Sequence, residues 1–288
     1  MEPVLSDPVL EFRPDTVRAV RAMYGLDGPG RMAEAVRILD DWVRMQPHFK
    51  KKDFSKRYLE ATVVACKGSV ERAKSKIDKY CTIRTQILDG HFCVFSELTV
   101  LPKMTEDYHR VILLYPVKVH IAYFQLIEYL KVHDYSNGFI FIIDYIDANL
   151  MELIPKVNLT DMTQWFSWFT EGFGMRINSI NIISNSKLVD VVITLFKKAL
   201  SAKIGERIRV LDSVEKLFEV VDKKLLPSEY GGEERSMKTI CDAISSKEHV
   251  EYLKMMSGAT TDEAYRLSDD VTDEAMGIAG TFRTLNVD

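Results

Sequence analysis

Residues 139–143 are Phe-Ile-Phe-Ile-Ile, a run in which every side chain is large and apolar. A strand that is apolar at successive positions has both faces covered, as the central strand of a parallel sheet does. Further short apolar runs occur at 111–115, 179–183 and 207–211, and helical patterns lie between the runs at about 118–132, 160–173 and 187–200. This alternation predicts right-handed crossovers and an α/β fold with a mostly parallel sheet.

The first 90 or so residues show helical spacing instead. One helix is expected after Asp15 as its cap, with Val17, Val20 and Met23, and others at about 31–45, 53–65 and 69–85. Lys50-Lys51-Lys52 is expected to be a solvated loop, and a last helix is expected near 236–256. We therefore divide the chain into an all-helical lobe at 1–95, an α/β lobe at 96–250 and a tail at 251–288 that packs on the domain.

Composition excludes several classes of protein. The chain has 288 residues, of which 47% are hydrophobic and 28% charged, so it is able to form a large core and is unlike a disordered protein. A net charge of −4 argues against nucleic-acid binding. No apolar stretch approaches the length of a membrane span, no signal peptide is evident, and the four cysteines form no C-x-x-C pair. We expect a cytoplasmic protein with free thiols.

Motifs for catalysis are absent from the sequence. It contains no Walker A pattern, no G-x-G-x-x-G after a strand, no H-E-x-x-H and no G-x-S-x-G. His91 and Cys93 are interpreted as packing residues or as part of a nucleophile site, and Asp144 and Asp147 as turn and cap residues or as functional groups at a strand end. We expect no enzyme, no cofactor and no metal.

The helix expected at 187–200 is more apolar than a surface helix needs to be. One narrow stripe is polar, and it consists of Lys187, Asp190, Thr194, Lys197, Lys198 and Ser201. The remaining positions are apolar, Val192, Phe196 and Leu200 among them. The helix either packs deep against the sheet or forms a lid, with one face on an apolar cavity and the other able to enter a membrane interface.

A basic cluster follows this helix directly. Five basic residues stand against the single acid Glu206, which gives a local charge of +4; they are Lys197, Lys198, Lys203, Arg207 and Arg209. The cluster is either a solvated polar face or a contact for an anionic membrane.

Large side chains are concentrated between Asp161 and Met175. The segment contains two of the three tryptophans, and its large residues are Trp165, Phe166, Trp168, Phe169, Phe173 and Met175. They are expected to fill the core, to form the wall of an apolar pocket, or both.

Three motifs carry a family resemblance. Gly138-Phe-Ile-Phe-Ile-Ile-Asp144 resembles the G-x-x-x-x-x-D strand of CRAL-TRIO (Sec14-like) domains, and Ser179-Ile-Asn-Ile-Ile-Ser-Asn185 resembles the strand that precedes their gate helix. Leu226-Pro-Ser-Glu-Tyr-Gly-Gly232 is similar to their closing L-P-x-E-Y-G-G motif. The segment from Cys66 through Arg84 resembles the helical lobe that accompanies these domains. The subgroup most similar is that of the α-tocopherol transfer and retinaldehyde-binding proteins, and the terminal Gly280-Thr-Phe-Arg283 resembles its insect members.

The resemblance implies a ligand pocket between the sheet and a mobile gate helix at about 187–204. The positions expected to line it, together with those indicated by the aromatic segment and the gate helix, are Phe139, Ile143, Leu150, Trp165, Trp168, Phe169, Phe173, Met175, Ile180, Val192, Phe196 and Leu200. Arg176, Lys203 and Arg207 align with phosphoinositide-binding positions, and Lys197 and Lys198 complete the expected membrane-facing set. Asn178 and Cys66 stand where the family has arginine.

The sequence thus predicts a non-enzymatic carrier. Its expected activity is binding and membrane-to-membrane transfer of a small hydrophobic ligand, which is a retinoid, tocopherol, carotenoid or other isoprenoid. We expect a monomer that touches anionic membranes transiently and is otherwise cytoplasmic. The alternatives are a phosphoinositide exchanger or lipid sensor, and an enzyme on a similar α/β scaffold.

Overall fold

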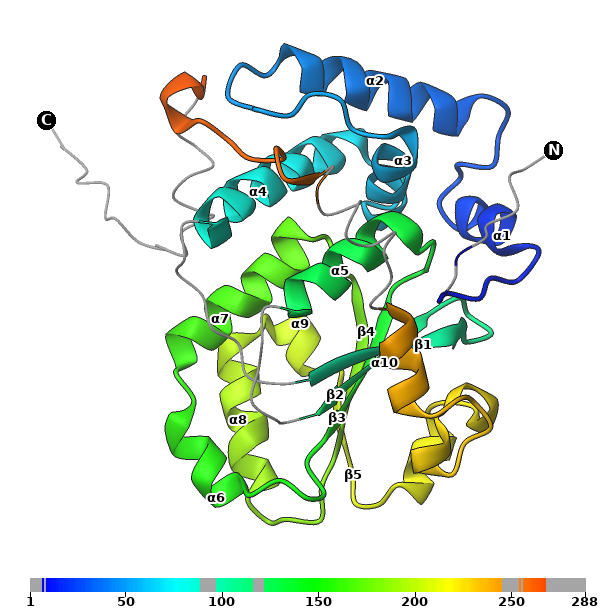
Figure 1. Cartoon of the computed structure of the whole chain (residues 1–288), viewed down its shortest axis with the longest axis vertical. Helices are drawn as coiled ribbons and strands as arrows, with labels where there is room; N and C mark the ends of the chain where they lie inside the picture. The colour runs from blue at the N-terminus through cyan, green and yellow to red at the C-terminus, as the bar shows by residue number, and fades with distance from the viewer. Residues whose placement is uncertain are drawn as a thin grey trace, which may run out of the picture.

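The structure is a computed structural model that describes residues 7, 9–88, 97–115, 122–244, 254 and 256–267. It contains an N-terminal group of helices stacked on an α/β unit (Figure 1). His91, Cys93, the acidic positions after Leu267 and the terminal Gly280-Thr-Phe-Arg283 lie outside the described residues. Within the described residues, no helix combines the length and the apolar character needed to cross a membrane.

The N-terminal helices are α1 (Thr16–Ala22), α2 (Arg31–Met45), α3 (Lys56–Ala65) and α4 (Val70–Leu88). All four were predicted, and α2 has the expected bounds. Helix α3 begins three residues later than expected because Ser55 is its cap and accepts the backbone N–H of Tyr58. The cap predicted for α1 is wrong: the Asp15 carboxylate makes no capping bond and accepts the Tyr108 hydroxyl at 2.7 Å instead.

The sheet has five strands in chain order: β1 (Glu97–Met104), β2 (Arg110–Tyr115), β3 (Phe139–Asp144), β4 (Ile177–Ile183) and β5 (Ile208–Leu211). Strands β2 to β5 are parallel, as predicted, and all residues of β3 are buried. Strand β1 was missed in the sequence. It pairs antiparallel with β2 at the sheet edge and contains Pro102, where its register shifts, and proline is tolerated in strands mainly at such edges.

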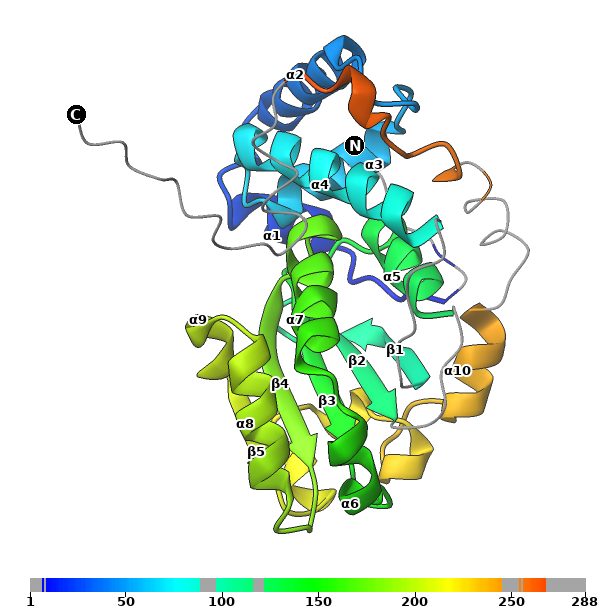
Figure 2. The same cartoon turned by 90° about the vertical axis from the view of Figure 1, so that its left-hand side faces the viewer.

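Helices cover one face of the sheet. They are α5 (Ala122–His133), α6 (Leu150–Leu153), α7 (Leu159–Ser167), α8 (Val189–Ala199) and α9 (Ala202–Gly205), and a short 3-10 turn, η1 (Ile154–Lys156), follows α6. The π-helical turn η2 (Trp168–Gly172) extends α7. Figure 2 shows α7 and α8 side by side in front of β3 and β4. Helices α5, α7 and α8 were predicted; the shorter α6 and α9 were not.

The other face carries short turns and one helix. These are η3 (Glu215–Glu219), η4 (Lys223–Leu225), η5 (Ser228–Tyr230) and α10 (Met237–Ile244). Their apolar residues form a second core with side chains from this side of β2, β3 and β4, including Leu113, Ile142 and Ile183. Helix α10 occupies the start of the helix expected at 236–256, and most of the remainder lies outside the described residues.

The sheet unit and the N-terminal helices approach each other closely at η2. A side-chain carbon at Gly172 would lie 2.2 Å from Cδ1 of Ile83 on α4, so a larger residue here would have to displace the buried Ile83 side chain. The contact brings the aromatic residues of η2 against α4 and so joins the two parts of the fold.

The described part of the tail packs on the N-terminal helices. Thr261 pairs with Phe49 in an isolated bridge, and Arg266, beside the turn η6 (Glu263–Tyr265), binds Asp78 of α4 at 2.7 Å. The expectation of a solvated loop at 50–52 is therefore only partly met: Lys50 donates its backbone N–H to Thr260, and Lys51 is largely covered and bound to Asp53. The fold class, helical lobe followed by a mostly parallel α/β sheet, is confirmed. The boundaries at 95 and 250 stay a prediction.

Candidate functional site

The candidate site lies on the helix-covered face of the sheet. Because side chains alternate along a strand, Phe139, Phe141 and Ile143 of β3 point to this face together with Ile180 and Ile182 of β4. All five are buried beneath α5, α7, η2 and α8 in one large apolar cluster.

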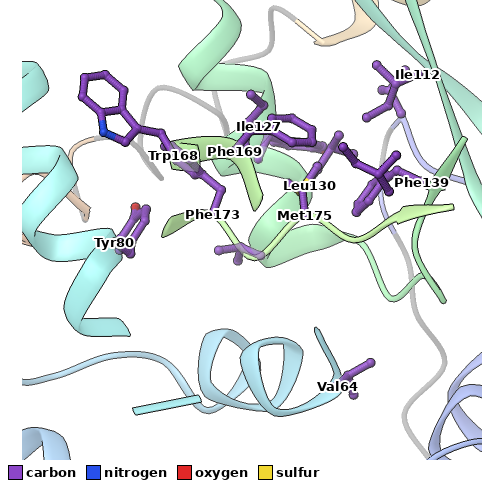
Figure 3. Packing of buried hydrophobic residues seen from close by; sticks show 14 of the residues in the cluster. Val64, Tyr80, Ile112, Ile127, Leu130, Phe139, Trp168, Phe169, Phe173 and Met175 are labelled. Atoms are coloured by element: carbon purple, nitrogen blue, oxygen red, sulfur yellow. The ribbon is translucent and has the colours of Figure 1, made fainter. Parts of the chain in front are cut away.

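Aromatic residues of η2 and the loop after it form one wall of this cluster. The ring of Phe169 meets Phe141 edge-on with centroids 5.2 Å apart, and Phe173 meets Tyr80 of α4 at 5.5 Å. Figure 3 shows Phe169, Phe173 and Met175 in one group with Leu130 of α5. Trp168 and Phe169, successive residues of the π-turn, are both buried in this cluster.

Helix α8 closes the opposite side. Val189, Val192 and Phe196 are buried against the cluster, and the Phe196 ring contacts Phe166 of α7 at 5.6 Å. The outer surface carries the predicted polar stripe, whose members are all exposed: Lys187, Asp190, Thr194, Lys197, Lys198 and Ser201. Val191 shares this outer surface and is 44% exposed.

The expected ligand positions come together in this one cluster. Eleven of the twelve are buried members of it: Phe139, Ile143, Leu150, Trp168, Phe169, Phe173, Met175, Ile180, Val192, Phe196 and Leu200. The backbone of Trp165 lies in α7, and its side chain is outside the described part. Their burial agrees both with a packed core and with a pocket wall, so their role in binding a ligand stays a prediction.

A cavity of about 50 Å³ lies where α3, α4 and α5 meet the start of β3. Its apolar lining includes Phe139, Phe173 and Met175, three of the expected ligand positions. Its polar lining includes Lys76, Lys131 and Asp134. The lining therefore combines buried members of the apolar cluster with charged side chains.

The sequence analysis did not predict the charged residues that line this cavity. A signal was present: Ile127, Leu130, Lys131 and Asp134 follow the i, i+3, i+4, i+7 spacing of a buried helix face. A lysine on such a face is unusual because burial of an ammonium is costly without a partner.

Lys131 is buried and has an unusual set of neighbours. Its Nζ lies 4.3 Å from the ring centroid of Tyr80 and 5.1 Å from that of Tyr58, and donates to the carbonyl oxygen of Gly172 at 3.3 Å. Burial lowers the pKa of Lys131 to about 7. Burial also raises the pKa of the nearby Cys66 thiol, so this cysteine is a neutral packing residue in the cavity wall.

The expected membrane-facing residues fall into two groups. Lys197, Lys198 and Lys203 are exposed, and they form no ion pair with any residue that the structure describes. Arg176 and Arg207 are only half-exposed and hold the backbone: the Arg207 guanidinium donates to the carbonyl of Ile177, and that of Arg176 donates to the carbonyl of Asn137.

The two positions that depart from the family arginines are also engaged. Cys66 is buried, and Asn178 contacts Nε2 of His109 at 3.0 Å. Arg176 lies over the ring of Tyr24 at 5.0 Å, and burial lowers its pKa. The role of these positions in binding a phosphoinositide stays a prediction.

Asp144 is a structural residue. Its Oδ1 accepts the backbone N–H of Ile146 at 2.9 Å, which is the turn contact expected for it, and its Oδ2 accepts the Tyr230 hydroxyl at 2.7 Å. In the described part of the chain, no group of three or more His, Cys, Asp or Glu side chains is arranged to hold a metal.

Comparison with known proteins gives one family match for the sheet unit. Residues 97–232 match the family model described as the CRAL/TRIO domain. Such a domain implies lipid binding or lipid transfer in general. The match covers β1 through the Gly231-Gly232 turn, and so includes all five strands and the helices α5 to α9.

Other comparisons add the following. No curated protein matches the chain. Thirty solved chains match, among them the one in a crystal structure of Sfh5, with 11% identity and a TM-score of 0.40 over 86% of this chain and 99% of that one. We draw no argument from a likeness at this level.

Proposed function

We propose that the protein binds one small hydrophobic ligand under α8 and transfers it between membranes without chemical change. The ligand class is a retinoid, tocopherol, carotenoid or other isoprenoid, in keeping with the resemblance to the α-tocopherol transfer and retinaldehyde-binding group. In this mechanism the ligand partitions between the membrane and the protein interior. Burial of its apolar surface in the protein stabilises the bound state by about 25 cal/mol per Å² relative to water.

The two-sided character of α8 carries the proposal. Its inner side, with Val192 and Phe196, covers the apolar cluster, while its outer side combines the exposed Val191 with Lys197 and Lys198. The helix ends at Ala199, and the extended backbone of Leu200 separates it from the single turn of α9. In this proposal Leu200 is the hinge about which α8 moves.

The exposed lysines support transient contact with an anionic membrane. Lys197, Lys198 and Lys203 follow one another on α8 and α9, and each basic residue near such a surface contributes about 1 kcal/mol. In this proposal the membrane binds the outer side of α8, α8 moves away from the cluster, and the ligand exchanges. The protein then returns to the cytoplasm.

The alternative function is that of a phosphoinositide exchanger or lipid sensor. It requires the aligned arginines to be available to a headgroup. Arg176 and Arg207 bind backbone carbonyls, and Asn178 is engaged with His109. These contacts favour the carrier over the exchanger.

Transfer between vesicles tests the proposal. Donor vesicles carry retinol, α-tocopherol or β-carotene, acceptor vesicles contain phosphatidylserine, and the rate is measured with and without the protein. We expect at least one of the three lipids to move faster than it does spontaneously. A parallel assay has phosphatidylinositol in the donor vesicles. Faster transfer of phosphatidylinositol alone would support the alternative instead.

A further inference from the structure

The cavity beside Lys131 has a charge that its surroundings do not balance. The Asp134 carboxylate in its wall is bound by Arg110 at 2.8 Å, and Lys76 is bound by Glu171 at 2.9 Å. Each of these charges therefore has a partner of opposite sign. Lys131 makes no ion pair with any residue that the structure describes, although its side chain is buried.

The contacts of Lys131 do not replace a counter-ion. An ammonium has three N–H donors. One is used by the carbonyl of Gly172, and the faces of Tyr58 and Tyr80 provide the remaining neighbours. Ring faces and a carbonyl dipole attract a cation, but a buried charge is usually paired with an opposite charge.

The Glu128 carboxylate, one turn earlier on α5, does not fill this role. It is bound by Arg84 of α4 and by the hydroxyl of Tyr80 at 3.3 Å. The ion pair between Arg84 and Glu128 leaves the positive charge of Lys131 uncompensated at the cavity.

The size of the cavity selects a small anionic group. A volume of about 50 Å³ has room for a few water molecules, since one water molecule needs roughly 10–15 Å³ of cavity volume. A carboxylate fits such a space and an inositol phosphate headgroup does not. Phe139, Phe173 and Met175 line the same cavity and belong to the apolar cluster, so an apolar chain attached to the carboxylate would extend into the expected ligand positions.

We propose that this cavity receives the carboxylate end of an apolar lipid, with the Lys131 ammonium as its counter-ion. The ligand would then be an amphiphile that ends in an acid, such as an isoprenoid acid or a fatty acid. This inference rests on the proposed carrier function.

Matched acids and esters test the inference. Retinoic acid and oleic acid are compared with their methyl esters in titrations of the purified full chain at pH 6.5. We expect each acid that binds to do so at least tenfold more tightly than its ester. In Lys131→Met, whose side chain is unbranched, uncharged and one atom shorter, this preference disappears while ester affinity changes less than threefold.

Lys79→Met is the matched control. Lys79 lies on α4, half-buried at 3.8 Å from Glu171, and is not in the cavity wall. This variant is expected to keep the tenfold preference for the acid.

The pH dependence of binding by the unmodified protein tests the inference even if Lys131→Met does not fold. The acid preference is expected to fall between pH 6 and pH 8.5, since the amine of Lys131 loses its proton over this range. Other titratable groups also surround the amine. Tyr58 and Cys66 come from α3 and its end, Lys76, Tyr80 and Cys81 come from α4, and Glu128 comes from α5 itself. Burial raises the pKa of both thiols, to about 12 for Cys81, so the cysteines stay neutral throughout.

The outcomes separate the two proposals. Esters that bind as tightly as acids, or an acid preference retained by Lys131→Met, would overturn the assignment of the carboxylate and leave the carrier function standing. If neither member of either pair binds, the carrier function fails for these ligand classes, and the inference fails with it.

Discussion

The hydroxyl of Tyr230 donates to Oδ2 of Asp144 at 2.7 Å, and both side chains are buried. This bond ties the end of the central strand β3 to the turn η5, which lies 86 residues later in the chain. It gives a physical role to two residues that stand out in the sequence, the aspartate that ends the apolar run and the tyrosine of Leu226-Pro-Ser-Glu-Tyr-Gly-Gly232. Together they hold the second core against the sheet.

Tyr230→Phe tests this role. Removal of the hydroxyl leaves a buried carboxylate oxygen without its donor, so we expect unfolding free energy to fall by about 1–3 kcal/mol. Urea denaturation measures the change. Tyr265→Phe, at a position 63% exposed, is the control and should have no measurable effect. An equally small effect at both positions would show that the bond to Asp144 contributes nothing.

Gly232 is a position at which only glycine fits. A Cβ atom there would lie 1.9 Å from the backbone oxygen of Leu226, and the φ of the preceding Gly231 is +68°. Gly232→Ala must therefore displace backbone, and we expect a loss of about 3 kcal/mol or more in unfolding free energy. Gly258→Ala, where the added atom meets only Cβ of Lys51 at 3.9 Å, serves as control. Wild-type stability for Gly232→Ala would contradict the packing of this turn.

The buried Lys131 predicts a dependence of stability on pH. Its pKa in the folded protein is about 7, below the unfolded value of roughly 10.4. Between these values the unfolded chain binds more protons, so stability rises with pH, by at most about 1.4 kcal/mol per pH unit. Below pH 7 both states carry the charge and this contribution to the slope vanishes.

Lys131→Met isolates the contribution. Urea unfolding of the wild type and the variant at pH 6, 7.5 and 9 gives the difference in stability at each pH. We expect the variant's advantage to shrink as pH rises from 7.5 to 9. A difference that is the same at all three pH values would show that the amine keeps its ordinary pKa.

The exposed lysines of α8 and α9 predict that the rate of transfer depends on the charge of the acceptor membrane. Replacing Lys197, Lys198 and Lys203 together by Glu should slow transfer to phosphatidylserine vesicles more than tenfold at physiological salt, since each lysine contributes about 1 kcal/mol of attraction. Transfer to neutral vesicles and ligand affinity should change little. Arg207 is left intact because its guanidinium holds the backbone of β4.

A charge-matched control accompanies this triple variant. Lys56, Arg72 and Lys224 are exposed and lie on α3, α4 and η4, away from α8. Reversing these three charges alters net charge equally and should leave the rate of transfer to anionic vesicles near that of the wild type. Equal slowing in both triple variants would show a general effect of net charge and no local membrane contact.

Much of the fold follows from local patterns in the sequence. The buried run of β3 and the spacing of α2, α5 and α8 reflect periodicities that survive in the structure. Strand β1 does not show such a pattern. Pro102 interrupts its alternation, and its pairing depends on β2 as a neighbour, which propensity does not encode.

The candidate site divides in the same way. The apolar members of the cluster were predictable because a segment as rich in aromatic residues as 161–175 must be buried. The sequence could not show which basic residues are bound to other groups. Arg176 and Arg207 contact carbonyls of residues that are far away in the chain. The Lys131 cavity likewise depends on α3, α4, α5 and β3 meeting, which no single segment specifies.

The most direct test of the carrier function is mass spectrometry of the lipid extracted from the full-length protein purified under native conditions. We predict a single apolar species at close to one molecule per chain. If Lys131 is the counter-ion of the ligand, this species has an acid group. A mixture of phospholipids, or no lipid above background, would contradict the proposal of one buried hydrophobic ligand.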